Sequence, residues 1–294
     1  DLAIASGAEG IGLLRTEFLF MNRETPPDEE EQYATLRKLV EGMNGQPVTI
    51  RTLDIGGEKL AYSLGGHMAE SVNPALGLRA IRFSLRQPKL FESQISAILR
   101  ANAHGPIRML LPMISTVGEV QEVRETSARV RRRLRRRGMN VGDQMPPIGV
   151  MIEVPGAALA ADALAGVSDF FAVGTNDLTM YTLAIDRSDE QVAHLYDPLH
   201  PAVLRLIQCS AQAALRARIP ISLCGEMAGD PRYTALLLGL GVRELSMSSA
   251  SLPRVKQQVR SLDLMAATRR AEMIMDQADP DRIEMLLDDF NAQI

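Results

Sequence analysis

Short, almost wholly apolar runs recur along the chain, and segments with helical periodicity separate them. Each run is three to five residues long. No two-residue hairpin turn joins neighbouring runs, which is typical of parallel strands that are buried on both faces. The pattern predicts seven strands, at Ile11–Leu14, Val48–Ile50, Arg108–Leu111, Ile148–Ile152, Phe170–Val173, Ile219–Leu223 and Glu244–Met247.

The segments between these runs have apolar residues at helical spacing. Asp28–Val40 follows two prolines and opens with an acidic turn, as helices commonly do. Further helices are expected at Gln94–Ala103, Val117–Arg137, Pro201–Arg218 and Arg232–Leu240. The alternation of strand and helix predicts an α/β fold.

A (β/α)₈ barrel accounts for this alternation, and an open doubly wound sheet is the alternative. A barrel has eight strands in about 250 residues, and this chain offers seven in 294 residues. Residues 1–10 have the pattern of a helix end, and the chain begins without Met. We therefore expect a barrel that lacks its first strand, with an open seam or a substitute beside Ile11–Leu14.

No linker rich in Pro, Gly or Ser divides the chain, although Gly65–Val72 has the composition of an exposed loop. We expect residues 1–262 to form the truncated barrel. Residues 263–294 are rich in Met and acidic residues and are interrupted by Pro280. They predict a helical tail that packs on the barrel or on a partner subunit.

Composition excludes several classes of protein. The chain is 46% hydrophobic and 23% charged, but no apolar stretch is long enough to cross a membrane. The net charge of −4 gives no signal for nucleic acid, and the basic run Arg129–Arg137 is expected to be a solvated helix end. Two cysteines cannot form a disulfide framework, which favours a reducing, cytoplasmic location.

Polar residues follow five of the predicted strands. They are Arg15, Arg51, Glu153, the pair Asn176-Asp177, and Cys224. In a barrel of parallel strands, the carboxyl ends converge on one mouth, where active sites lie. Any one of these residues alone would more simply be a surface residue, but five at equivalent positions favour a functional site.

The types of these residues indicate the chemistry. Guanidinium groups bind phosphate and carboxylate bidentately, and Arg79 and Arg187 could join Arg15 and Arg51. Two carboxylates on neighbouring strands suit Mg²⁺, which takes further ligands from water and substrate. No Gly-x-Gly-x-x-Gly follows a strand and no Walker A sequence occurs, so a small phosphorylated acid fits better than a dinucleotide.

Cys224 stands at a strand end and is followed by Gly225. A lone cysteine is commonly a small buried hydrophobe, whereas at a barrel mouth a thiol can act as a proton donor or a nucleophile. The position favours a functional role.

Four motifs stand in order along the chain: GIGLLRTEFLFM at 10–21, RTLDIGG at 51–57, GTNDLT at 174–179 and CGEMAGD at 224–230. Together they resemble the phosphoenolpyruvate (PEP)-utilising enzymes, and most closely the Enzyme I family of the bacterial phosphotransferase system. The chain departs from the family pattern at Met180, where Gln is usual, and at Ala172, where Ser is usual.

The resemblance implies a role for each candidate residue. Glu153 and Asp177 would hold Mg²⁺, and Cys224 would protonate the enolate of pyruvate. The phosphate and carboxylate of PEP would be bound by Arg15, Arg51, Arg79, Asn176 and Arg187, with Asp177 beside them.

The resemblance also implies partners and an activity. The activity would be transfer of the phosphoryl group of PEP to a histidine on a separate amino-terminal domain that is not recognisable in this chain, with onward transfer to the carrier HPr. The pathway served would be either sugar uptake or a nitrogen-related regulatory branch. The domain would form a homodimer. Alternatives are a PEP synthase or pyruvate phosphate dikinase type of domain, a non-catalytic PEP-binding or dimerisation module, and a Mg²⁺-dependent aldolase or lyase.

Overall fold

All seven predicted strands are present in the computed structural model, which describes residues 2–56 and 73–292. The predicted exposed loop Gly65–Val72 lies outside the described residues. The strands are β1 (Ile11–Arg15), β2 (Val48–Arg51), β3 (Ile107–Leu111), β4 (Ile148–Ile152), β5 (Phe170–Gly174), β6 (Ile221–Cys224) and β7 (Glu244–Ser246).

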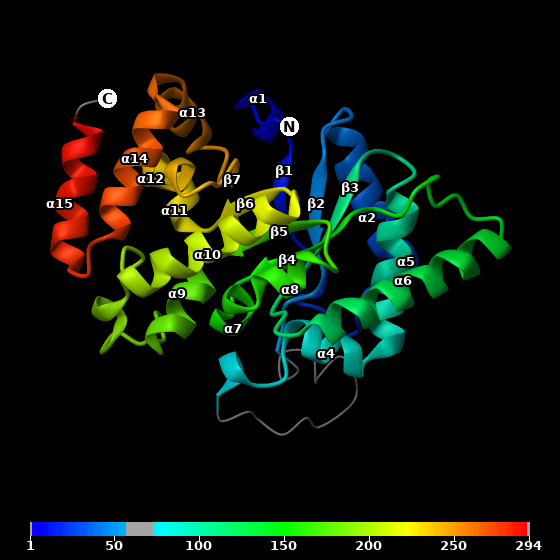
Figure 1. Ribbon diagram of the computed structural model, residues 1–294. Helices are drawn as coiled ribbons and strands as arrows, with labels where there is room; N and C mark the ends of the chain where they lie inside the picture. Colours follow the sequence, from blue (N-terminus) through cyan, green and yellow to red (C-terminus); the bar gives the residue numbers. More distant parts are fainter. Residues whose placement is uncertain (1, 57–72, 293–294) are drawn as a thin grey trace. The chain divides into compact units, whose positions relative to one another are not determined.

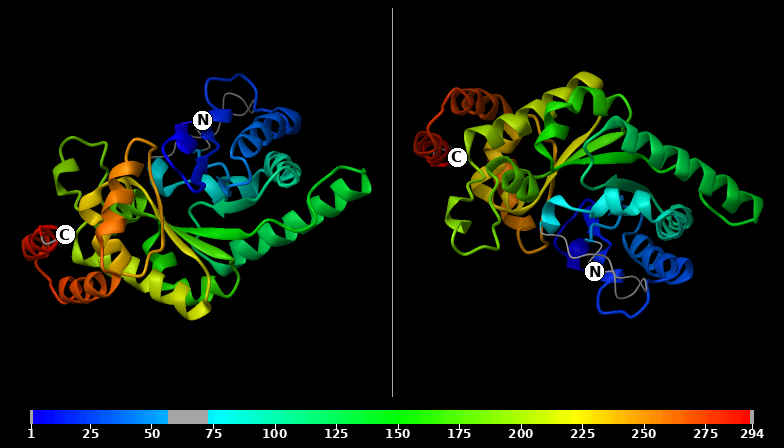
Figure 2. Two further views of the ribbon diagram at one scale, coloured as in Figure 1. Left: turned by 90° about the horizontal axis from the view of Figure 1, so that it is seen from above. Right: turned by 90° about the horizontal axis from the view of Figure 1, so that it is seen from below.

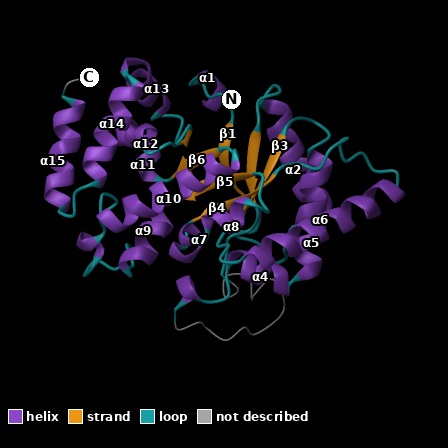
Figure 3. Cartoon of the chain, viewed as in Figure 1, coloured by secondary structure: helices purple, strands orange, loops and turns teal. Residues whose placement is uncertain are grey.

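Every described strand pair is parallel, and the order in the sheet follows the order in the chain, from β1 to β7. Chain-order parallel strands separated by helices are the topology of the (β/α)₈ barrel, so the predicted fold class is confirmed. Figure 3 shows the strands in orange with helices following each of them along the chain. The predicted seam beside β1 stays a prediction.

Most strands extend one residue further than predicted, and this shift matters for the site. Arg15, Arg51 and Cys224 are the last residues of β1, β2 and β6 rather than the first residues of loops. At its other end β6 begins at Ile221 rather than Ile219, because Pro220 has no amide hydrogen to donate.

The five predicted helices are present, and several shorter ones accompany them (Figure 1). The α-helices are α1 (Leu2–Ala5), α2 (Glu29–Gly42), α4 (Ala80–Arg86), α5 (Pro88–Ala101), α6 (Val117–Arg136), α7 (Pro155–Leu159), α8 (Ala161–Ala165), α9 (Thr175–Leu183), α10 (Pro201–Ala217), α11 (Glu226–Gly229), α12 (Pro231–Gly239), α13 (Leu252–Ser261), α14 (Leu264–Met275) and α15 (Pro280–Asn291). Three 3₁₀ turns are η1 (Glu17–Leu19), η2 (Pro74–Leu76) and η3 (Ala193–Leu195).

Capping boxes explain where α2 and α6 begin. In α2 the Asp28 carboxylate accepts from the Glu31 amide, and the Glu31 carboxylate accepts from the Asp28 amide. Thr116 and Glu119 do the same for α6. Each box satisfies two of the amides that a helix start leaves without partners.

The basic end of α6 is mostly solvated, as the sequence predicts. Val130 and Leu134 are fully buried, whereas Arg132, Arg136 and Arg137 are exposed. In Figure 2, α6 is a long helix in green. None of the helices in the described ranges is both long and apolar enough to cross a membrane.

The chain forms two compact units. The first unit is Glu9–Val150, and the second unit is Leu2–Ala8 with Met151–Ile294. In the first unit α5 packs against α2, α4 and α6, around side chains that are fully buried, such as those of Leu36, Ile95 and Ile98.

In the second unit the tail helices pack on α12. The predicted tail is two helices, α14 and α15, and Pro280 is the first residue of α15. Arg232 of α12 pairs with Asp288 and Glu284 of α15, both at 2.8 Å. Lys256 of α13 donates to the Gly7 carbonyl just after α1, at 2.8 Å. The predicted boundary at residue 262 stays a prediction.

The contact of α12 with α14 depends on Gly239. A Cβ at Gly239 would lie 2.4 Å from the Ala267 carbonyl oxygen and 2.7 Å from the Ala271 Cβ. We expect Gly239→Ala to lower the free energy of unfolding by about 1 to 3 kcal/mol, because backbone must shift to make room. Urea denaturation measures this change.

The matched control is Gly42→Ala. Gly42 is also the last residue of its helix, but nothing lies within 4 Å of a Cβ there. This variant should be neutral or more stable by about 0.5 kcal/mol. Equal effects of the two substitutions would show that α12 and α14 are not in close contact.

Candidate active site

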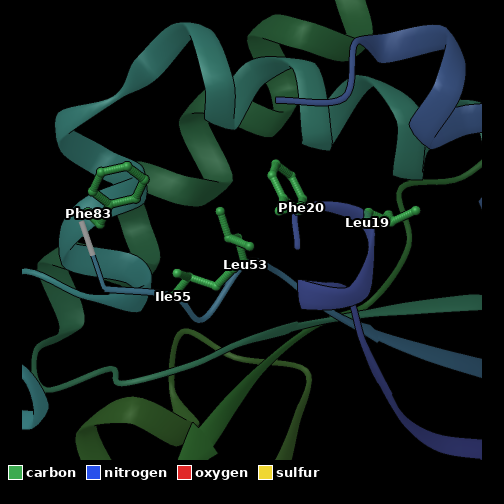
Figure 4. Close-up of a cluster of buried hydrophobic side chains, with 5 residues drawn as sticks. All are labelled: Leu19, Phe20, Leu53, Ile55 and Phe83. Atoms are coloured by element: carbon green, nitrogen blue, oxygen red, sulfur yellow. The ribbon is translucent and has the colours of Figure 1, made fainter. Parts of the chain in front are cut away.

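The loops that follow β1 and β2 rest on one cluster of buried apolar side chains (Figure 4). It consists of Leu19, Phe20, Leu53, Ile55 and Phe83. The first two come from the turn after β1, the next two from the segment after β2, and Phe83 from α4. Because the cluster excludes water, it fixes both loops relative to α4, and with them the polar side chains at the strand ends.

Arg15 and Arg51 are direct partners in the parallel ladder of β1 and β2. Arg15 is exposed, whereas the Arg51 side chain is only 11% exposed. The register therefore places these two arginines side by side at the carboxyl ends of adjacent strands.

Asp54 joins Arg51 to Arg79. Its side chain is only 2% exposed. One carboxylate oxygen lies 3.1 Å from Nη1 of Arg51, and Arg79 binds both oxygens through Nη2 at 2.9 and 3.0 Å. The carboxylate thus holds two guanidinium groups next to each other in fixed orientations.

Glu17 is a second carboxylate in this network. Its Oε1 lies 3.2 Å from Nη2 of Arg51 and accepts from the Asp54 amide at 2.8 Å. Together with Arg15, the network has three arginines and two carboxylates. Its formal charge is therefore positive, which favours an anionic ligand.

The backbone around Arg79 is unusual. Arg79 immediately precedes α4 and forms an antiparallel bridge with Gly56. The next residue, Ala80, has φ of +52° although it is fully buried and has a Cβ. A left-handed alanine costs about 1 to 3 kcal/mol and persists where the surroundings impose it, which is common at functional sites.

In the second unit, Glu153 is buried immediately after β4. Its side chain lies against Gly174, where a Cβ would be 3.0 Å from Oε2 of Glu153 and 3.1 Å from its Cβ. Gly174 is the last residue of β5, and α9 with Asn176 and Asp177 begins at the next residue. A larger residue at this point would press on the Glu153 side chain, so the glycine lets the carboxylate lie close to the β5 backbone.

The start of α9 is joined to the end of β6. The Thr175 hydroxyl donates to the Cys224 carbonyl at 3.0 Å, and the Glu226 amide donates to Oδ1 of Asn176 at 3.2 Å. Gly225 lies between these contacts with φ of +111°, and a Cβ there would be 2.4 Å from the Thr175 hydroxyl oxygen. The side-chain oxygen of Asn176 accepts from the Glu226 amide. The side-chain N–H groups of Asn176 are donors, and they are the part of the amide that can bind an anion.

Arg187 lies in the loop after α9 and contacts Glu226, the first residue of α11. Its Nη1 lies 3.0 Å from Oε1 of Glu226, and both side chains are exposed. Tyr196 donates its hydroxyl to the Asn176 carbonyl at 3.5 Å. Burial raises the pKa of the Tyr196 phenol, and the Thr179 hydroxyl and Arg187 oppose part of that rise.

The Cys224 thiol is buried at the end of β6. Its Sγ donates to the Val173 carbonyl at 3.4 Å. This bond requires the protonated thiol, which is the form that a proton donor must start from. Cys209, the other cysteine, is exposed on α10.

The donor set suits a hard cation. In the described part of the chain, no group of three or more His, Cys, Asp or Glu residues is arranged to hold a metal ion. Mg²⁺, however, needs only one or two protein carboxylates beside water and phosphate oxygens. The buried carboxylate of Glu153 and the carboxylate of Asp177 in the first turn of α9 therefore fit Mg²⁺ better than a metal that prefers nitrogen or sulfur.

The predicted site residues thus fall into two sets. Arg15, Arg51 and Arg79 gather in the first unit, and Glu153, Asn176, Asp177, Arg187 and Cys224 belong to the second unit. Within the second set, hydrogen bonds connect Asn176, Arg187 and Cys224 through Thr175 and Glu226. Their individual roles in binding and catalysis stay predictions.

The chain matches the PEP-binding domain of PEP-utilising enzymes over residues 1–264. It is 49% identical over 276 residues to a phosphoenolpyruvate-protein phosphotransferase of Cupriavidus necator, covering 94% of this chain and 46% of the relative. The chain belongs to the PEP-utilising enzyme family.

Other members of the family agree with this assignment. A phosphoenolpyruvate-protein phosphotransferase of Haemophilus influenzae is 44% identical over 291 residues, covering 99% of this chain and 50% of that protein. The enzyme of the same name from Geobacillus stearothermophilus is 44% identical over 273 residues, which is 93% of this chain and 47% of that protein. The chain therefore spans about half the length of these curated relatives.

A solved structure of a citrate lyase from Burkholderia xenovorans is a more distant likeness. Its TM-score is 0.48 at 16% identity, and the match covers 95% of this chain and 87% of the other.

The sequence did not single out several residues that contact the predicted ones or their neighbours. Among them are Glu17, which binds Arg51, and Gln94, which accepts from the Leu53 amide. Asp54 and Glu226, like Glu17, are part of family motifs and had no role assigned. Gln94 and Tyr196 lie outside all four motifs, and nothing in their local sequence marks them.

The Asp54 carboxylate should be important for stability. We expect Asp54→Asn to lower the free energy of unfolding by about 3 kcal/mol, because it leaves two largely buried guanidinium groups without their shared counter-ion. Denaturation by urea at neutral pH measures this.

Asp162→Asn is the matched control. Like Asp54 with Arg79, Asp162 binds Arg216 through both carboxylate oxygens. Here, however, the Asp162 side chain is 69% exposed and the Arg216 side chain is 58% exposed. Its loss should change the free energy of unfolding by less than about 1 kcal/mol. A loss for Asp54→Asn as small as that of the control would contradict the bridging role.

Proposed function

We propose that this chain is the PEP-binding catalytic domain of a phosphoenolpyruvate–protein phosphotransferase. The parent enzyme would move the phosphoryl group of PEP to a histidine on a separate amino-terminal domain and release pyruvate. Residues 1–262 would form the PEP-binding barrel, and residues 263–294 its helical tail. The relatives named for this activity support the proposal, and so does the positive arginine network of the first unit.

The observation that carries the proposal is the pair of guanidinium groups held by Asp54. PEP has a phosphate and a carboxylate separated by only a few bonds, and each can accept two parallel N–H bonds from an arginine. Arg51 and Arg79 are adjacent and oriented before any ligand binds, so little side-chain entropy remains to be lost. Arg15, beside Arg51 in the ladder, adds a third donor group.

These groups would act mainly on the transition state. Phosphoryl transfer spreads negative charge over the transferred group and the leaving oxygen, and fixed cationic donors stabilise that charge. In the second unit, Arg187 would supply another cationic donor, and Asn176 would supply neutral N–H donors. We assign all five residues to the binding of PEP.

Glu153 and Asp177 would hold Mg²⁺. When bound, Mg²⁺ supplies a charge that neutralises phosphate and enolate oxygens. The protein's part is to keep the Glu153 carboxylate buried and in place against Gly174.

Cys224 would be the acid. When the bond between phosphorus and the enol oxygen breaks, the phosphoryl group goes to the histidine and the electron pair stays on the enolate. The methylene carbon of the enolate then takes a proton from the Cys224 thiol, which gives pyruvate and a thiolate. Sγ donates to the Val173 carbonyl, a bond that only the thiol form can make.

The partners follow from this role. The phosphorylated histidine would pass its group to an HPr-type carrier, and the domain would act as a homodimer in the cytoplasm. The two free cysteines are consistent with a reducing compartment. We propose no nucleic-acid or membrane partner.

Two other functions remain as alternatives. A PEP synthase or dikinase domain would use the same arginines and carboxylates. A PEP-binding or dimerisation module would bind PEP without turning it over. The relatives named as protein phosphotransferases favour the main proposal.

Calorimetry with PEP tests the proposal on this chain. We expect binding in the presence of Mg²⁺ that weakens about tenfold or more in Glu153→Gln, which keeps the shape but loses the metal-binding charge. Glu190→Gln, an exposed site outside the motifs, is the control and should bind as the unmodified chain does. Absence of PEP binding by the unmodified chain with Mg²⁺ present would contradict the proposed function.

Cys224→Ala tests the acid in the full-length enzyme. PEP binding should persist, while the rate of pyruvate formation falls about 100-fold or more, as expected for loss of a general acid. Cys209→Ala is the matched control, because that thiol is exposed on α10, and it should retain the normal rate. A normal rate for Cys224→Ala would exclude Cys224 as the proton donor.

A further inference from the structure

We propose that Gln94 of α5 is a positioning residue for the anion-binding arginines, because its buried amide fixes the ends of β1 and β2 relative to each other. This inference rests on the proposed function, in which those arginines bind PEP. Gln94 lies outside every motif that relates the chain to its family.

The Gln94 amide contacts both strand ends at once. Its Oε1 accepts from the Leu53 amide at 2.9 Å, two residues beyond the end of β2. Its Nε2 donates to the Thr16 hydroxyl at 3.1 Å, one residue beyond the end of β1. The residue is only 2% exposed, so water cannot replace these bonds.

Thr16 continues the connection to the backbone of Arg51. Its hydroxyl donates to the Arg51 carbonyl at 2.9 Å, and Thr16 itself is fully buried. The hydroxyl proton is used in that bond, so the Thr16 oxygen is the acceptor for Gln94. The donor and acceptor directions along the chain Gln94–Thr16–Arg51 are therefore fixed.

These bonds occur where the ladder of β1 and β2 ends. Arg15 and Arg51 are the last paired residues of this ladder. Beyond Arg51 the Thr52 amide still donates to the Leu110 carbonyl of β3 at 3.0 Å, but that bond does not join β2 to β1. Side-chain bonds from α5 take over at this point. Since a guanidinium lies several bonds from its Cα, a small rotation of the strand end would move its donors away from the position set by Asp54.

Gln94 differs from the other buried glutamine of the first unit. Gln32 of α2 is fully buried and donates to the Pro27 carbonyl at 3.1 Å and to the Ser93 hydroxyl at 3.5 Å. Those contacts join α2 to its own preceding loop and to α5, with no arginine among them. Gln32 therefore provides a substitution of the same type in the same unit without a link to the strand ends.

The experiment compares Gln94→Met with Gln32→Met in this chain. Both variants remove a buried amide of similar size, and thermal melting measures the stability that each one loses. We expect the affinity for PEP with Mg²⁺, measured by calorimetry, to fall about tenfold for Gln94→Met and to stay within about twofold for Gln32→Met. Binding of Mn²⁺ alone, followed by electron paramagnetic resonance, should be the same in both variants.

A second pair of variants keeps the test valid if Gln94→Met does not fold. Thr16→Val retains the shape of the side chain but removes the hydroxyl, and Thr16→Ser retains the hydroxyl. We expect Thr16→Val to weaken PEP binding about tenfold and Thr16→Ser to restore it.

The outcomes separate the two proposals. If the unmodified chain does not bind PEP, the proposed function is wrong. If the unmodified chain binds PEP and Gln94→Met or Thr16→Val binds equally well, the positioning role is wrong. If Gln32→Met weakens PEP binding as much as Gln94→Met, the effect is one of general stability, and the inference is overturned.

Discussion

Parallel pairing puts the carboxyl ends of neighbouring strands at the same edge of their sheet, and most of the chemistry of this chain depends on that constraint. Arg15 meets Arg51 because β1 and β2 are parallel and in register. The Gly174 backbone meets Cys224 for the same reason. Antiparallel pairing would have sent every second strand end to the opposite edge. Main-chain hydrogen bonds thus bring the polar residues at the strand ends together, independently of any contact between their side chains.

Side-chain contacts then determine orientation, and each unit does this differently. In the first unit, a carboxylate with almost no exposure, Asp54, compensates Arg51 and Arg79, and apolar packing under the loops excludes water. In the second unit, glycines allow close approach of backbone and side chains. Gly174 leaves room for Glu153, and Gly225 leaves room for Thr175. In the first unit an ion pair fixes the long arginine side chains. In the second unit the glycines have no side chain, so the shorter side chains of Glu153 and Thr175 can lie close to the backbone.

The sequence was sufficient for the strands and the major helices, because those have strong local signals. It also marked polar residues at the strand ends, and their roles stay predictions. Continuous apolar runs mark β4 and β5, and Asp28 with Glu31 marks the start of α2. The short helices α7, α9 and α11 have only 5, 9 and 4 residues, which is too short for a helical period to stand out, so no pattern predicted them. The pairing of Asp54 with Arg79 and the contacts of Gln94 join segments 25 to 78 residues apart. No local rule contains that information.

The pairing of Arg187 with Glu226 has a consequence for how the second unit responds to salt. In the proposed role, an anion that takes the place of the Glu226 carboxylate on Nη1 of Arg187 exchanges one negative group for another. When the anion exchanges with Glu226, the net charge around Arg187 changes less than it would if the arginine had no carboxylate partner beforehand. Because both side chains are exposed, dissolved ions screen the resident pair as well as the incoming one. Two screening effects of opposite sign partly cancel, and the contribution of Arg187 to anion binding should depend only weakly on ionic strength.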